Sequence, residues 1–207
     1  MHPNPAFRDT VQAESLRFVR ERAFGMLAVS GEGAPLLSHV PFLLSDDGAH
    51  ADLHLVRSNP ISRAVGAGLA ARLAVSGADG YVSPDWYGLG PDQVPTWNYV
   101  AVHLTGRLVP LPDDALEPLL AAQSASFEAR LPKRPWTMDK MTAETKARLI
   151  RMIRPFRLEI AQVDSTWKLG QNKPDDARQA AAGAVAGGFG QELEALAALM
   201  QSPPAID

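Results

Sequence analysis

The stretch "FGMLAVSGEGAPLLSHVPFLLSDDGAHADLHLV", residues 24–56, decides the fold class of this chain. It holds three runs rich in aliphatic side chains, at 24–30, 35–45 and 51–56, separated only by the short turns "GEGA" and "SDDGAH". Such runs, bounded by Gly, Asp and Ser, are typical of strands joined by tight turns. Strands connected this closely pair antiparallel, because a parallel crossover needs a dozen or more residues. The stretch therefore predicts an antiparallel sheet.

The rest of the chain adds helices and further strands around this sheet. Helices are predicted at about 10–22, 61–72, 112–130 and 142–152, with two more after residue 174; strands are predicted at 72–83, 99–111 and 156–163. No Gly-rich strand-to-helix fingerprint of a nucleotide-binding βαβ unit is present. We expect an α+β, mainly β fold: an antiparallel barrel with inserted helices over residues 1–165. The C-terminal motif and helices, 166–207, are expected to pack on the barrel within the same domain.

Composition excludes several classes of function. The chain has 207 residues, of which 46% are hydrophobic, and a formal net charge of −3. This charge gives no general attraction to nucleic acid or to an anionic membrane. The absence of cysteine excludes disulfides, thiolate metal sites and cysteine nucleophiles. The N-terminus "MHPNPAFRDT" lacks a signal-peptide pattern, and no run approaches a membrane span, so a cytoplasmic protein is expected.

Two polar clusters precede predicted helix starts. "RSNP" contributes Arg57, Ser58 and Asn59, and "WKLGQNKP" contributes Lys168, Gln171 and Asn172 together with Lys173. Free backbone N–H groups and the helix dipole favour anions at such places, and cationic side chains add to this. Each cluster also has an ordinary explanation, because Asn59 is a standard helix cap and Arg57 is as well suited to a surface ion pair. Their recurrence nevertheless favours a phosphate group as ligand.

An aromatic, proline-punctuated loop supplies candidate walls for a flat ligand. The aromatic candidates are Trp86, Tyr87, Trp97 and Tyr99, and the short polar side chains beside them are Ser83, Thr96 and Asn98. Flat apolar walls with a few polar groups suit a ring system with one polar edge. The same aromatics are equally suited to core or dimer packing. The loop is therefore consistent with a flat ring system as ligand but does not require one.

Three histidines, His39, His54 and His103, fall on predicted strands. None has the short spacing of a recognised metal motif, so we expect no metal site. No GxSxG elbow, cysteine nucleophile or carboxylate pair suggests hydrolytic chemistry. No catalytic residue is therefore identified from the sequence.

The ordered motifs "SHVPFLL", "HLVRSNP", "YVSPDWYG", "VPTWNYVAVHLTG" and "WKLGQNKPDDAR" resemble the PaiB-like family of FMN-binding split-barrel proteins. The similarity runs from Phe24 to about Met200. It implies a split β-barrel, FMN as cofactor, a homodimer, and flavin contacts from His39 and His54. The cofactor-binding candidates are then His39, His54, Arg57, Ser58, Asn59, Ser83, Thr96, Trp97, Asn98, Lys168, Gln171 and Asn172.

Two classes of function stay open at this point. One is a flavoprotein, with oxidoreductase chemistry on an unspecified substrate. The other is a PaiB-type transcriptional regulator that acts through DNA or a protein partner. Haem handling, suggested by some related split barrels, is a third possibility beside these two classes. The best nucleic-acid candidate is the basic stretch "KARLIRMIRPFR", residues 146–157. We expect this stretch to be an amphipathic helix with Leu149, Met152 and Ile153 facing inward and the cations facing solvent, so strong nucleic-acid binding is not expected.

Overall fold

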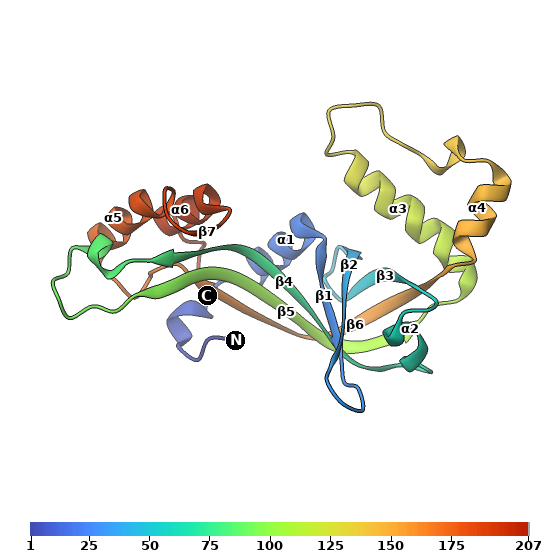
Figure 1. The fold of residues 1–207 in the computed structure, drawn as a ribbon, viewed down its shortest axis with the longest axis horizontal. Helices are drawn as coiled ribbons and strands as arrows, with labels where there is room; N and C mark the ends of the chain where they lie inside the picture. Colours follow the sequence, from blue (N-terminus) through green and yellow to red (C-terminus); the bar gives the residue numbers. More distant parts are fainter. Residues whose placement is uncertain (207) are drawn as a thin grey trace. The chain divides into compact units, whose positions relative to one another are not determined.

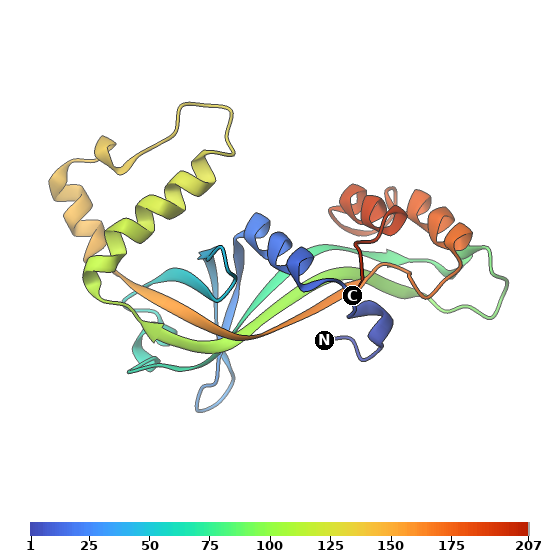
Figure 2. The ribbon, with the colours of Figure 1, turned by 180° about the vertical axis from the view of Figure 1, so that it is seen from behind.

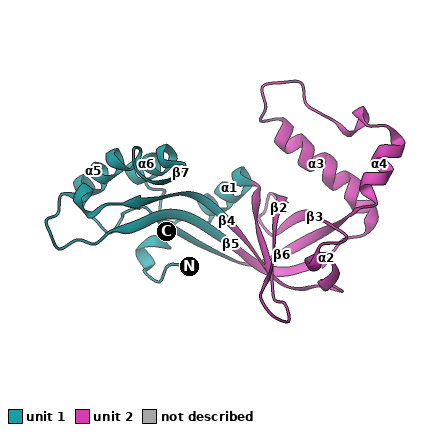
Figure 3. Ribbon diagram, viewed as in Figure 1, with its two compact units in different colours: residues 1–22, 75–103, 163–207 teal, residues 23–74, 104–162 magenta. Residues whose placement is uncertain are grey.

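The computed structural model describes residues 1–206 and divides into two compact units, each assembled from separate parts of the chain (Figure 3). Unit 1 consists of Met1–Arg22, Val75–His103 and the segment from Val163 to the C-terminus. Unit 2 consists of Ala23–Ala74 and Leu104–Gln162. Three long strands contribute residues to both units.

Figures 1 and 2 show the elements from opposite sides. The helices are α1 (Gln12–Arg22), α2 (Pro60–Ala64), α3 (Leu116–Glu128), α4 (Ala143–Ile150), α5 (Asp175–Val185) and α6 (Leu193–Gln201). The strands are β1 (Phe24–Val29), β2 (Leu36–Leu44), β3 (His50–Val56), β4 (Leu69–Val82), β5 (Thr96–Pro110), β6 (Ile153–Lys168) and β7 (Gly190–Gln191). Strand β7 pairs with β4 antiparallel through Asp79 and Gly80.

The sheet closes into a barrel, as the sequence predicts. Its strand order is β1-β2-β3-β6-β5-β4, and an additional β1–β4 pairing closes the ring. The β1–β2, β2–β3, β3–β6 and β1–β4 pairs are antiparallel. The register of the first hairpin sets Met26 opposite His39 and Leu27 opposite Ser38. Closure removes the unpaired edges that an open sheet would leave.

The barrel interior is filled by alternate residues of its strands. On β2 the side chains of Val40, Phe42 and Leu44 are buried, whereas the side chains between them are partly exposed. Phe42 and Phe156 are fully buried, and each contributes about 1.5–3 kcal/mol by leaving water. Gly106 allows β5 and β6 to approach closely, because a Cβ there would lie 1.8 Å from the Glu159 carbonyl oxygen.

Unit 1 has its own hydrophobic core, in which helices α5 and α6 and the parts of β4, β5 and β6 that belong to this unit meet (Figure 3). Three small residues of α5, Ala177, Ala181 and Ala182, are almost completely buried in this core. Trp167 is also buried there, and its ring meets that of Phe18 of α1 edge to face. Small side chains allow the helix to lie close to the sheet, and the large indole fills the remaining space.

Most predicted elements are confirmed, but three details of the sequence analysis are wrong. The helix predicted at 61–72 ends at Ala64 and β4 begins at Leu69, because Gly66 and Gly68 adopt positive φ angles that a helix does not tolerate. The last strand of the barrel is longer than predicted and includes Lys168. The stretch 146–157 is not one amphipathic helix, because α4 ends at Ile150 and Ile153 begins β6, and Leu149 and Met152 are 43% and 53% exposed instead of facing inward.

Candidate functional site

Lys168 and Thr96 are brought together in unit 1. Lys168 is the last residue of β6, Thr96 is the first of β5, and the Lys168 Nζ donates a hydrogen bond to Thr96 Oγ1. The ammonium also lies 5.9 Å from the centre of the Phe7 ring. Lys168 forms no ion pair with any carboxylate of residues 1–206, and partial burial lowers the pKa of its ammonium group. A half-buried cation without a counterion is suited to bind an anion.

The turn after Lys168 is held in shape by its own side chains. Gln171 accepts a hydrogen bond from the Leu169 N–H (2.8 Å) and donates one to the Trp167 carbonyl (2.5 Å). Gly170 has a φ of 85°, a conformation that favours glycine. Gln171 is therefore a structural residue of the turn, whereas Asn172 beside it is exposed. The first turn of α5, which follows, carries Asp175 and Asp176, and these carboxylates disfavour an anion at that helix end.

The aromatic residues of unit 1 divide into buried and exposed ones. Trp97 is 38% exposed, donates from Nε1 to Asp79 Oδ1 (3.2 Å), and meets Tyr81 and Phe189 edge to face. Phe189 is 72% exposed, so these three rings form an open aromatic surface. Adjacent residues of a strand point to opposite faces, so Trp97 and Thr96 face different sides of β5.

Other candidates from this region are less accessible. Tyr87 is a core residue, and Asn98 is only 1% exposed, with its Nδ2 donating to the Met200 sulfur and its Oδ1 without a partner within residues 1–206. Ser83 is partly buried and precedes a short 3₁₀ helix without capping it through its side chain. Neither Tyr87 nor Asn98 presents a surface to a ligand in this structure.

The "RSNP" residues lie in unit 2, and most of their polar groups already have partners. Asn59 caps α2 by accepting from the Ile61 N–H (2.8 Å), and it donates to Ser38 Oγ (3.1 Å). Arg57 pairs with Asp113 (3.1 Å) and donates to the Arg151 carbonyl. Ser58 is exposed. The ordinary explanations for Asn59 and Arg57, a helix cap and a surface ion pair, are confirmed.

The two candidate histidines of unit 2 have different surroundings. His39 is exposed on β2, and its ring stacks on that of the exposed Phe24 at 6.3 Å between centroids. Burial lowers the pKa of the His54 imidazole, and the neighbouring Gln123 of α3 opposes this shift in part. Its Nδ1 is buried without a partner within residues 1–206. Of the two, only His39 is open to a large ligand.

Residues 1–206 offer neither a metal centre nor a membrane-spanning helix. No group of three His, Cys, Asp or Glu side chains in this part of the chain is placed to hold a metal ion. In the same residues, every helix is too short or too polar to cross a membrane.

Comparison with known proteins identifies the family to which this chain belongs. A family model described as "Putative FMN-binding domain" matches residues 1–162. The chain therefore belongs to this family, and its domain is an FMN-binding domain. The resemblance inferred from the sequence motifs, and FMN as cofactor, are confirmed.

Individual relatives agree with this assignment. The protease synthase and sporulation protein PAI 2 of Bacillus subtilis (strain 168) is 29% identical over 169 residues, covering 81% of this chain and 80% of that protein. The solved FAD and heme binding protein from Mycobacterium smegmatis has a TM-score of 0.57 at 21% identity, covering 88% of this chain and 81% of its own. The flavocytochrome Anf3 from Azotobacter vinelandii has a TM-score of 0.56 at 17% identity, covering 81% and 72%. The two structures show the fold, a flavin-binding split barrel.

The site contains residues that the sequence analysis did not select. Phe7, Asp79, Tyr81 and Phe189 contact predicted residues. Phe189 stands in the "GGFG" segment, where an isolated aromatic between glycines is a usable signal. Phe7 comes from the other end of the chain, and no local pattern could have connected it to Lys168.

Proposed function

We propose that Lys168, with Thr96, binds the phosphate of FMN. The supporting observation is the half-buried ammonium of Lys168, which has a hydroxyl partner but no ion pair within residues 1–206. A doubly charged phosphate would supply the missing countercharge, and the Thr96 hydroxyl can rotate to donate to it. The residues present therefore fit the phosphate of the cofactor. Arg57, Ser58 and Asn59 fit it less well, because Arg57 and Asn59 already have partners.

The ring of the flavin requires a flat aromatic face to stack on, and exposed aromatic side chains of each unit offer such faces. In unit 1 these are the ring faces of Trp97 and Phe189, which meet edge to face, and in unit 2 they are those of His39 and Phe24, which stack. Exposed aromatic rings that gather on a surface are suited to ligand or subunit contacts. We therefore propose a homodimer in which these surfaces are covered by the flavin and by the second copy.

The proposed activity is oxidoreduction on a substrate not yet identified. FMN supplies one- or two-electron transfer when bound, and the protein binds and orients it. The direct experiment is titration of the purified full-length chain with FMN, followed by the flavin's visible absorption, together with a mass measurement in solution. Saturable binding of one FMN per chain in a particle of two chains is expected. A monomer that binds no FMN would contradict the proposal.

A regulatory function through DNA receives little support from the geometry. In the stretch 146–157, Lys146 pairs with Glu117, and Arg157 forms a two-point ion pair with Asp52 at 2.7 and 2.8 Å. This leaves less free positive charge than the sequence suggested. The sporulation role in the name of the Bacillus relative belongs to that protein, and no feature of this chain leads us to propose it here.

A further inference from the structure

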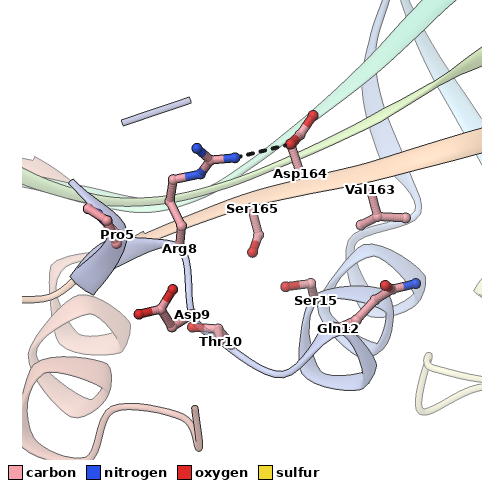
Figure 4. Close-up of a pocket in the computed structure, with 9 residues that line it drawn as sticks. All are labelled: Pro5, Arg8, Asp9, Thr10, Gln12, Ser15, Val163, Asp164 and Ser165. Atoms are coloured by element: carbon pink, nitrogen blue, oxygen red, sulfur yellow. Dashed lines mark hydrogen bonds and ion pairs between the residues drawn. The ribbon is translucent and has the colours of Figure 1, made fainter. Parts of the chain in front are cut away.

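Unit 1 contains a polar cavity that involves none of the predicted flavin contacts. Its volume is about 340 Å³, within the range of small-molecule sites. It lies between the N-terminal segment, the first turn of α1 and the β6 residues 163–165 (Figure 4). Hydroxyl, carboxylate and guanidinium groups dominate the lining, and Pro5 and Val163 are the apolar members. Such a lining suits a small hydrophilic molecule.

Two residues that are largely buried, Thr10 and Ser15, line this cavity with hydroxyl groups. Thr10 is 7% exposed, and its hydroxyl makes no hydrogen bond within residues 1–206. Ser15 is 1% exposed; its Oγ accepts from Trp167 Nε1 (3.1 Å), but its proton has no acceptor in the same residues. Because both residues line the cavity, their hydroxyls are available to hydrogen-bond a ligand there. Because Ser15 stands in the first turns of α1, such a ligand also meets the positive end of that helix.

The charges of the cavity are of both signs. Arg8 and Asp164 form a long ion pair at the cavity, 3.4 Å between Nη2 and Oδ1 (Figure 4). Asp9 has no ion pair within residues 1–206. A purely anionic ligand would meet two carboxylates, and a purely cationic ligand would meet the guanidinium and the helix N-terminus. A molecule with one charge of each sign satisfies both.

We propose that this cavity binds a small free α-amino acid. Its carboxylate is held by Arg8, the hydroxyls of Thr10 and Ser15, and the first turn of α1. Its ammonium is held by Asp9 and Asp164. The limited apolar lining restricts the ligand to a short side chain, for which serine is a suitable representative.

The test is calorimetric titration of the full-length chain with three matched probes. L-Serine carries both charges, ethanolamine lacks the carboxylate, and N-acetyl-L-serine lacks the ammonium. Saturable binding of L-serine alone is expected. Equal binding of all three, or no saturable heat with L-serine, would overturn the proposal.

Two substitutions in the lining test whether L-serine binds in this cavity. Arg8→Gln and Asp164→Asn are each expected to weaken L-serine binding by at least about tenfold, because each removes one charge-assisted contact. Arg17→Gln is the control, since Arg17 lies on α1, whose first turns line the cavity, but pairs with Glu14 and Glu21 and is not part of the lining. FMN affinity, measured in parallel, reports that each variant is folded. L-Serine binding that is unchanged in both cavity variants would exclude this cavity as the site.

Discussion

The two units use their polar residues in different ways. In unit 2, the closed barrel, Asn59 and Arg57 are engaged by neighbouring groups, and His54 lies against Gln123. In unit 1, Lys168 has no countercharge within residues 1–206, and Trp97 and Phe189 remain open. Polar groups engaged within the fold contribute to its stability, whereas unpaired ones are available to a ligand. This difference supports the proposal that the phosphate binds in unit 1 and that unit 2 serves mainly as the scaffold.

The largest effect is expected at the barrel. Gly106→Ala would place a Cβ 1.8 Å from the Glu159 carbonyl oxygen, so β5 and β6 must separate. We expect a loss of about 3 kcal/mol or more in the free energy of unfolding, measured by denaturant titration. An unchanged midpoint would show that the barrel is not the rigid scaffold described here.

The next effect concerns the unpaired cation of unit 1. Lys168→Met should weaken FMN binding by about 1–3 kcal/mol, because a charge-assisted contact in a half-buried place is lost. Fluorescence titration with FMN measures it, with Arg17→Gln as a control on the exposed side of α1 in the same unit. Equal affinities of the Lys168 variant and the wild type would assign Lys168 to the surface.

A pH effect is expected from His54 of unit 2. Its pKa in the folded protein lies below the ordinary 6.5, so the unfolded chain binds the proton more readily. Its contribution to stability is therefore complete above pH 6.5 and is lost as the pH falls towards the folded pKa, by at most about 1.4 kcal/mol per pH unit.

Denaturant titrations of the wild type and His54→Gln across this pH range isolate the contribution. The difference in unfolding free energy between the two proteins should change below pH 6.5 and stay constant above it. A difference that does not depend on pH would contradict the described burial of His54.

The smallest effect is expected from a second glycine substitution, in helix α5 of unit 1. Gly183 stands inside α5, and a Cβ there would meet no atom within 4 Å. Gly183→Ala should therefore stabilise the protein by about 0.5–1 kcal/mol, because alanine loses less backbone entropy in a helix. A destabilised variant in thermal unfolding would show that this face of α5 is covered in solution.

The barrel could be predicted from the sequence because the residue patterns that specify its hairpins are local. Alternating burial on β2 and short turns such as "GEGA" specify hairpins without reference to the rest of the chain. The helix predicted at 61–72 failed because "VGAGLAAR" contains both helix formers and glycines, and the positive φ angles of Gly66 and Gly68 decided the outcome.

The candidate site was less predictable, because it depends on long-range contacts. Lys168 and Thr96 are 72 residues apart, and Phe7 joins them from the N-terminus. Asn98 and Tyr87 have the residue types of a cofactor pocket, but tertiary packing buries them. Residue type therefore identified the candidates, and only burial and pairing could separate ligand contacts from structural residues.

The assignment of the phosphate to Lys168 is tested most directly by comparing FMN with riboflavin, which lacks the phosphate. Both flavins should be titrated into the wild type and into Lys168→Met, and the ratio of the two dissociation constants determined for each protein. The account predicts that the wild type prefers FMN and that the variant loses at least about tenfold of this preference. An identical preference in both proteins would show that the phosphate binds elsewhere.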